Sequence, residues 1–225
     1  LQVTVLDVFC NVVPGATVTF AAPAAGSTAT LDASSVVTDA QGRALVHATA
    51  SAVAGAFTVQ ATVPGVAAAT VFSLTNLAGA PAAIAVSLGD AQSAVVDTPF
   101  AQTLEVSVKD ADGNAVPNAA VTFTPPTVGA TAVLAATVVS TDASGRASTS
   151  ASAGTVTGRY DVTATVPGGA APAVFALTNT PGAPAAISAS AASTPQSARV
   201  TTPYVQPLVA TVTDYGAGVA AEHLP

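Results

Sequence analysis

The chain has 225 residues, of which half are apolar and only 8% charged, and its formal net charge is −7 at pH 7. Its five basic residues are too few and too scattered to neutralise a run of phosphates, which excludes nucleic acid as a partner. Thr, Ser, Gly or Pro interrupts every apolar run before the roughly 18 to 20 residues that a membrane span needs.

Strand-like segments alternate with turn residues along the chain, and no segment keeps a helical period. The clearest is 158–166, where apolar side chains fall on every second position and Pro167 and Gly168 end the run. This pattern predicts an all-β fold. The strands predicted within 81–183 contain, in chain order, Ile84, Val86 and Leu88; Leu104, Val106 and Val108; Val121 and Phe123; Val138 and Val139; Ala147, Ala151 and Ala153; Tyr160, Val162 and Ala164; and Val174, Phe175 and Leu177.

The sequence repeats itself without a gap over about 80 positions, at the offset that separates Leu1 from Leu104. A third copy starts at Pro184, contains one inserted residue, and fades after Asp214. We therefore predict a module at 1–80 that lacks its first strand, a complete module at 81–183, and the first strand or strands of a third module at 184–225. The stretches 77–81 and 180–184 are predicted to be short linkers.

Several motifs recur in the same order in both copies. They are Asp110 to Pro117, Val121 to Phe123, Asp142 to Arg146 and Gly158 to Ala164, and their counterparts lie 103 residues earlier. Their order and spacing resemble the bacterial immunoglobulin-like (Ig-like) domains, group 1, of the invasin and intimin type. This resemblance implies tandem Ig-like β-sandwich modules on an extracellular protein at the bacterial cell surface. Most modules of such arrays serve as a stalk, and a distal one binds.

The expected function is therefore a structural stalk or spacer in a surface adhesin or fibre. One alternative is a fibre subunit that assembles by strand complementation, and another is a module that binds a glycan or host protein through its loops. The loops carry no aromatic cluster of the kind that binding sites favour, which argues against the last alternative. Expected partners are neighbouring modules of the same chain or of identical chains. No enzymatic activity and no cofactor are predicted.

Few residues suggest site chemistry. Asp110, Asp112 and Asn114 place oxygen ligands at alternate positions around a glycine, as in calcium loops, although the first copy has Phe9 at the middle position, so plain turn capping is preferred. His47 and His223 occupy no common position in the repeat, so no catalytic role is assigned to them. Cys10, which stands where the second copy has Gly113, has no neighbouring basic group that would activate it.

The first copy has no counterpart of 81–103, so the strand of Ile84, Val86 and Leu88 is missing from it. Burying three such side chains contributes roughly 5 to 9 kcal/mol, so the first module is not expected to stand alone as an intact sandwich. Two hypotheses follow. The first, which we favour, is that this sequence is part of a longer array whose preceding residues supply the strand. The second is that the segment around Ile187, Ala189 and Ala191 of one molecule completes the first module of another.

Overall fold

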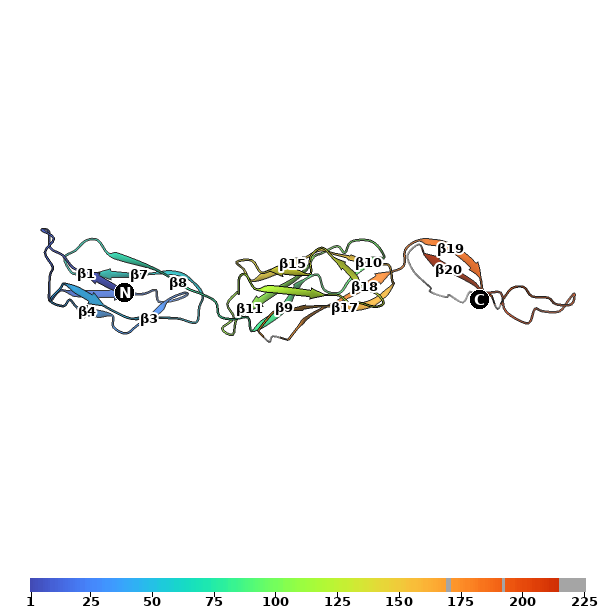
Figure 1. The fold of residues 1–225 in the computed structure, drawn as a ribbon, viewed down its shortest axis with the longest axis horizontal. Helices are drawn as coiled ribbons and strands as arrows, with labels where there is room; N and C mark the ends of the chain where they lie inside the picture. Colours follow the sequence, from blue (N-terminus) through green and yellow to red (C-terminus); the bar gives the residue numbers. More distant parts are fainter. Residues whose placement is uncertain (169–170, 192, 215–225) are drawn as a thin grey trace. The chain divides into compact units, whose positions relative to one another are not determined.

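The computed structural model describes residues 1–168, 171–191 and 193–214 (Figure 1). These residues form twenty β-strands and no helix, which confirms the predicted all-β class. Contacts divide the chain into two compact units. The first contains Leu1–Ala80 with Lys109–Val116, and the second contains Pro81–Val108 with Pro117–Pro225.

The first unit contains eight strands in three sheets. A pair, β1-β5, faces a four-stranded sheet of order β4-β2-β7-β8, and β3 pairs with β6. Buried side chains of β2, β5 and β7 meet between the layers, among them Val18, Ala44 and Ala61. The bounds are β1 (Gln2–Thr4), β2 (Thr17–Ala21), β3 (Ala29–Leu31), β4 (Ser35–Val37), β5 (Arg43–Leu45), β6 (Ala48–Ala50), β7 (Gly55–Thr62) and β8 (Thr70–Asn76).

The second unit repeats these sheets and adds a strand to each main layer. Its sheets have the orders β15-β11-β9, β10-β18-β17-β12-β14 and β13-β16, and β19 pairs with β20. The bounds are β9 (Ala83–Leu88), β10 (Gln92–Val95), β11 (Leu104–Lys109), β12 (Ala120–Thr124), β13 (Ala132–Leu134), β14 (Val138–Ser140), β15 (Arg146–Thr149), β16 (Ala151–Ala153), β17 (Gly158–Thr165), β18 (Ala173–Thr180), β19 (Pro184–Ala189) and β20 (Ala210–Asp214).

One eight-residue strand of each unit, β17 and β7, shows why the pattern folds this way. Tyr160, Val162 and Ala164 of β17 are buried while the residues between them are more exposed, as the alternation predicted. Phe57, Val59 and Ala61 of β7 are buried in the same way. Because matching residues form matching strands with matching registers, the two copies adopt the same local structure, as expected from their gapless alignment.

Three details of the predicted strands were wrong. Leu88 is 43% exposed at the end of β9, where only Ile84 of the predicted trio is buried, because the chain turns away at Gly89. Ala147, Ala151 and Ala153 do not share one strand but belong to β15 and β16, which pair with different partners. The short strands β10 and β13 were not predicted, since neither shows a clear apolar alternation.

Candidate functional site

The turn at Asp110 is the first candidate, because it held the calcium prediction. Asp110 Oδ1 accepts the backbone N–H groups of Asp112 and Asn114 at 3.0 and 2.8 Å. Its Oδ2 accepts Asn114 Nδ2 at 3.0 Å and the N–H of Gly79 at 2.8 Å. These bonds, the Asn114 side chain first, lower the pKa of Asp110 to about 2. Both carboxylate oxygens therefore serve as acceptors in the turn, and this geometry favours turn capping over coordination of a cation.

The same turn recurs in the first copy. Asp7 Oδ1 accepts the N–H groups of Phe9 and Asn11 at 2.9 Å each, and Asn11 Nδ2 donates to Asp7 Oδ2 at 3.0 Å. The Asn11 side chain lowers the pKa of Asp7. Cys10 adopts a left-handed φ of 66°, where Gly113 has 85°, and it is exposed. The turn is thus kept although Cys10 replaces the glycine.

Linker glycines bond to the turn aspartates that follow them in the sequence. Besides Gly79 and Asp110 in the first unit, the N–H of Gly182 donates to Asp214 Oδ2 at 2.7 Å in the second. Asn114 extends the first arrangement, because its Nδ2 donates to Ala52 O at 2.8 Å and its Oδ1 accepts the Ala54 N–H at 3.0 Å. The turn Lys109–Val116 therefore belongs to the first compact unit although the second copy of the repeat encodes it.

The other chemical candidates form no reactive cluster. His47 lies at the surface, where its Nδ1 is 2.9 Å from Asp32 Oδ2, and this contact lowers the pKa of Asp32. His223 lies outside the described residues. Within the described residues no group of three or more His, Cys, Asp or Glu could hold a metal ion, and no helix is long and apolar enough to cross a membrane.

A buried polar pair was missed by the sequence reasoning. The Tyr160 hydroxyl donates to Asn179 Oδ1 at 3.0 Å, and Asn179 Nδ2 donates to the carbonyls of Thr131 and Val156 at 3.0 Å each. Burial raises the pKa of Tyr160 to about 12. Asn76 ties the matching loops of the first copy through Thr28 O and Val53 O, with Phe57 in place of the tyrosine. The sequence signal for this arrangement was the asparagine at matching positions near the ends of β8 and β18, Asn76 and Asn179.

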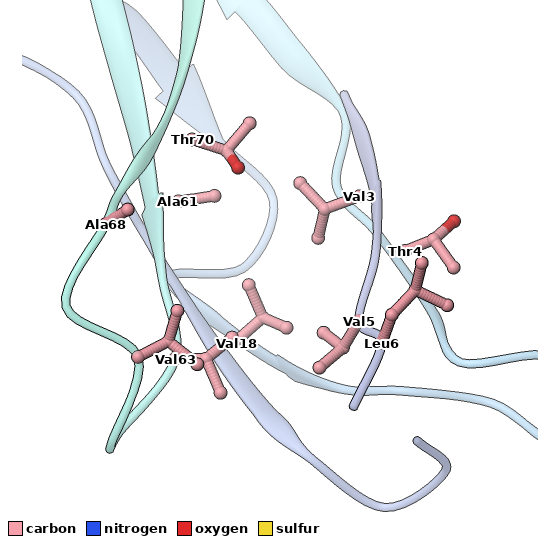
Figure 2. Close-up of a pocket in the computed structure, with 10 residues that line it drawn as sticks. Val3, Thr4, Val5, Leu6, Val18, Ala61, Val63, Ala68 and Thr70 are labelled. Carbon is pink, nitrogen blue, oxygen red and sulfur yellow. The ribbon is translucent and has the colours of Figure 1, made fainter. Parts of the chain in front are cut away.

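Two grooves open on the first unit. The first has a volume of about 210 Å³ and lies between the free edge of β1 and the end of β7. Figure 2 shows Val3 and Val5 pointing toward Ala61, Val63 and Val18 across it, whereas Thr4 points away. In the second unit β9 lies beside β11, the counterpart of β1, and the counterparts Val106 and Val108 are fully buried. The first groove therefore corresponds to the surface that β9 covers in the second unit.

The second groove has a volume of about 430 Å³ and is lined by β6 and β8, with Ala48, Ala50 and Leu74 among its residues. Their counterparts Ala151, Ala153 and Leu177 are at most 4% exposed. The second unit covers them with residues 92–100, where β10 pairs with β18 and Phe100 donates its N–H to Ala151 O at 3.0 Å. Both grooves thus correspond to surfaces that residues 81–103 cover in the second copy.

The predicted donor residues lie at the surface. Ile187 and Ala189 belong to β19, whose six residues are all exposed, and Ala191 follows it, also exposed. Ile187 is paired with Val212 of β20 in the strand ladder.

Comparison with known proteins agrees with the sheet arrangement. The model of the bacterial Ig-like domain (group 1) family matches residues 1–75 and 89–176. The chain belongs to this family. This confirms the resemblance drawn from the repeated turns and strands. A search of curated proteins gives no match.

The solved structures of FdeC and InvD share the fold of this bacterial Ig-like chain. The adhesin FdeC of Escherichia coli is 22% identical with a TM-score of 0.60, and the alignment covers 93% of this chain and 67% of that one. InvD of Yersinia pseudotuberculosis is 20% identical with a TM-score of 0.59, covering 95% of this chain and 64% of that one. The D0-D1 domain of intimin is 27% identical over 77% of this chain and 87% of that one, with a TM-score of 0.32.

Proposed function

We propose that this chain is a spacer of a bacterial cell-surface adhesin, in which Ig-like modules present a distal binding function outside the cell. Membership of the bacterial Ig-like family supports this role, as does the fold shared with the E. coli adhesin FdeC. The partners in this role are neighbouring modules, and the chain itself performs no catalysis.

The linker bond to the turn aspartate carries the proposal. It occurs at Gly79 with Asp110 and again at Gly182 with Asp214, so the capped turn is used to hold the linker that precedes it. A binding module would instead leave its turn groups available to a ligand. Among the described residues, the exposed large aromatic side chains are Phe9 and Tyr204, which is few for a recognition surface.

Limited proteolysis tests the linker role of the turn. Asp110→Ala removes the acceptor for the Gly79 N–H, so we expect faster cleavage within 77–81 by a protease of broad specificity. Asp112→Ala is the matched control, because Asp112 lies in the same turn and contributes only its backbone N–H to the bonds described there. Equal cleavage rates in the two variants would contradict a role of Asp110 in holding the linker.

A display experiment tests the spacer role itself. The chain is placed between an outer-membrane anchor and a reporter domain of known ligand, and compared with an unrelated Ig-like segment of equal length. We expect equal capture of the reporter ligand by both, and no saturable binding of the chain to arrays of host proteins or glycans. Saturable binding that loop substitutions abolish would replace the spacer role with a recognition role.

A further inference from the structure

The chain enters and leaves the second copy at opposite ends of strand β18. Pro81, the first residue of the second unit, lies beside the connection that precedes β18, since a Cβ on Gly168 would come within 2.7 Å of Pro81 O. The chain leaves β18 at its other end, Thr180, and continues directly into Pro181. A pull on the two ends of this module therefore acts along β18.

Strand β10, which follows the entry point in the sequence, pairs in parallel with the second half of β18 (Figure 1). Gln92 lies opposite Leu177, and Val95 lies opposite Thr180. Tension reaches β10 from its N-terminal side and β18 from its C-terminal side. Because the strands are parallel, this tension draws them in opposite directions along their common axis. The hydrogen bonds of a parallel ladder are evenly spaced, so they share the load and break together.

Strand β9 lies between Pro81 and β10 in the sequence, but it does not relieve this load. It belongs to the other layer, beside β11, whereas β10 is at the edge of the five-stranded sheet. Detaching β9 lengthens the chain that leads to β10 and leaves the β10–β18 pair intact. The parallel pair must therefore fail before the N-terminal segment of the module separates from its C-terminal strand.

Further hydrogen bonds strengthen the pair at both of its ends. Before β10, Asp90 Oδ1 accepts the Ala176 N–H at 2.8 Å. After β10, Val96 donates its N–H to Thr180 O at 3.0 Å, and the Thr180 hydroxyl donates to Ala94 O at 3.2 Å. Each of these bonds joins the N-terminal segment to β18, so each is stretched when the two strands slide past one another.

The segment after β10 is anchored to a second strand, β16. Thr98 O accepts the Ala153 N–H at 2.8 Å, and Phe100 donates its N–H to Ala151 O at 3.0 Å. The side chains of Val96 and Phe100 are 8% and 7% exposed. Sliding β10 along β18 therefore also withdraws two apolar side chains from the core, which is unfavourable in water.

We infer that the second copy is a load-bearing module, in which the parallel pair β10–β18 is the mechanical clamp that resists extension of the chain. Under tension the clamp opens in one cooperative step, and its rate of opening sets the lifetime of the module. The use of this resistance rests on the proposed spacer role, in which tension between the cell and a bound surface runs through every module. The resistance itself does not depend on that role.

Pulling the full chain in two directions with optical tweezers tests the clamp. Both variants carry Cys10→Ser. The first has Ala80→Cys and Ala183→Cys as attachment points, both exposed, so that the force shears β10 along β18. The second has Asp97→Cys and Ala183→Cys, which lie just past the C-terminal ends of the two strands, so that the force separates their bonds one after another. We expect unfolding at the same force to be slower in the first by about tenfold or more.

The length gained on unfolding identifies the module in each trace. It corresponds to roughly 340 Å of extended chain between positions 80 and 183, and roughly 290 Å between 97 and 183. Asp97 is exposed and has a φ of 61°, a conformation that Cys10 also adopts, so cysteine is compatible with this position. Denaturant titrations without force should give the two variants equal stability. Equal unfolding rates in the two pulling directions overturn the clamp.

A pair of proline substitutions in β10 tests which bonds carry the load. Val96 N–H and Ala94 O face β18, and because alternate residues of a strand face the same neighbour, the Ala94 N–H faces it too. Val95 O accepts the Thr98 N–H, so Val95 faces away from β18. In the shearing direction, Ala94→Pro is expected to raise the unfolding rate by about tenfold. Val95→Pro, which removes an N–H at the free edge, should raise it much less.

Thr180→Val gives a milder version of the same test if Ala94→Pro fails to fold. It removes the hydroxyl bond to Ala94 O and keeps the branched shape, so we expect unfolding a few-fold faster under load. Thr178→Val, the same change two residues earlier on the same face of β18, is the matched control. Equal rates for these two variants overturn the assignment of the clamp to β10 and β18. The display experiment is unaffected by these results, because it applies no load.

Discussion

The two copies of the repeat form the same strands, but equivalent side chains are buried to different extents. Leu177 is fully buried in the second copy, whereas its counterpart Leu74 is half-buried beside an open groove. Ala151 and Ala153 are buried, and Ala48 and Ala50 are exposed. Local sequence is therefore enough to specify the strands and turns, while burial of these side chains in the second copy depends on residues 92–100, which lie before the repeated part of the sequence. A module of this kind acquires its strands and its closed core from separate parts of the sequence.

The largest difference in stability between the two copies is expected when a core leucine is truncated at matching positions. Leu177→Ala is expected to destabilise the second copy by about 2 to 5 kcal/mol, because a closed core cannot relax fully around the cavity. Leu74→Ala should destabilise the first copy by less than half as much, since the side chain is already partly exposed beside a groove. Hydrogen exchange read on β17 and β7 measures both. Equal losses of protection would show that the first core is as closed as the second.

The buried asparagines give the next largest contrast. Asn179→Ala is expected to destabilise the second copy by about 1 to 3 kcal/mol, because it leaves the Tyr160 hydroxyl and several loop carbonyls without their donor or acceptor. Asn76→Ala should cost less, since Phe57 has no hydroxyl to leave unpaired. Denaturant titrations of the two variants measure the difference, and Asn179→Asp serves as a second variant that keeps the acceptor oxygen.

Replacing Cys10 by glycine, the residue found at the matching position 113, should stabilise the turn. A non-glycine residue in the left-handed region costs roughly 1 kcal/mol, so Cys10→Gly is expected to stabilise the first unit by about that amount. Cys10→Ser keeps the left-handed strain and is the control. A thermal unfolding experiment compares them. Identical unfolding temperatures for the two variants would mean that the turn stores no such strain.

Acid should loosen the turn at Asp110. Its pKa is about 2 in the folded chain, below the ordinary value of 3.8, so the ionised form is favoured by folding. The resulting stabilisation is complete above the ordinary pKa and is lost as the pH falls through about 2. In Asp110→Asn this pH dependence should be absent. Proteolysis of the linker by an acid-stable protease across this range measures the effect, with Asp112→Asn as the control.

Calcium should have the smallest effect of all. Because N–H donors already engage both oxygens of Asp110, saturating Ca²⁺ is expected to leave the thermal unfolding of the chain unchanged relative to Mg²⁺ or EDTA. A rise in unfolding temperature with Ca²⁺ that Asp110→Asn abolishes would restore the coordination role.

Sequence reasoning predicts most of the fold because alternation is a local property. The alternation of Tyr160, Val162 and Ala164 predicts their strand. Asp142 and Gly145 predict the turn between β14 and β15. It fails where the alternation is short or interrupted: Gln92–Val95 pairs in parallel with a strand far away in the chain, and the alanines from 147 to 153 give no sign of a change of sheet at Ser150.

The candidate site was only partly predictable for a related reason. The alignment identified Ile187 as the counterpart of Ile84, but it could not show that residues 92–100 cover Ala151 and Ala153 in the second copy. The sequence does not indicate the hydrogen bond from the Gly79 N–H to Asp110 either, because every residue except proline has a backbone N–H that could donate. The partner of Tyr160 likewise depends on how two strand ends meet.

The linker bond has a consequence for how such arrays diverge. A Cβ at Gly79 would meet Asp110 at ordinary van der Waals distance, and the nearest contact at Gly182 is likewise ordinary. Neither glycine has the left-handed backbone that would exclude other residues. Residues other than proline at these linker positions therefore keep the N–H donor, whereas a change of the aspartate to an apolar residue removes the acceptor. Sequences of this family should drift fastest at the donor and slowest at the acceptor of the same hydrogen bond.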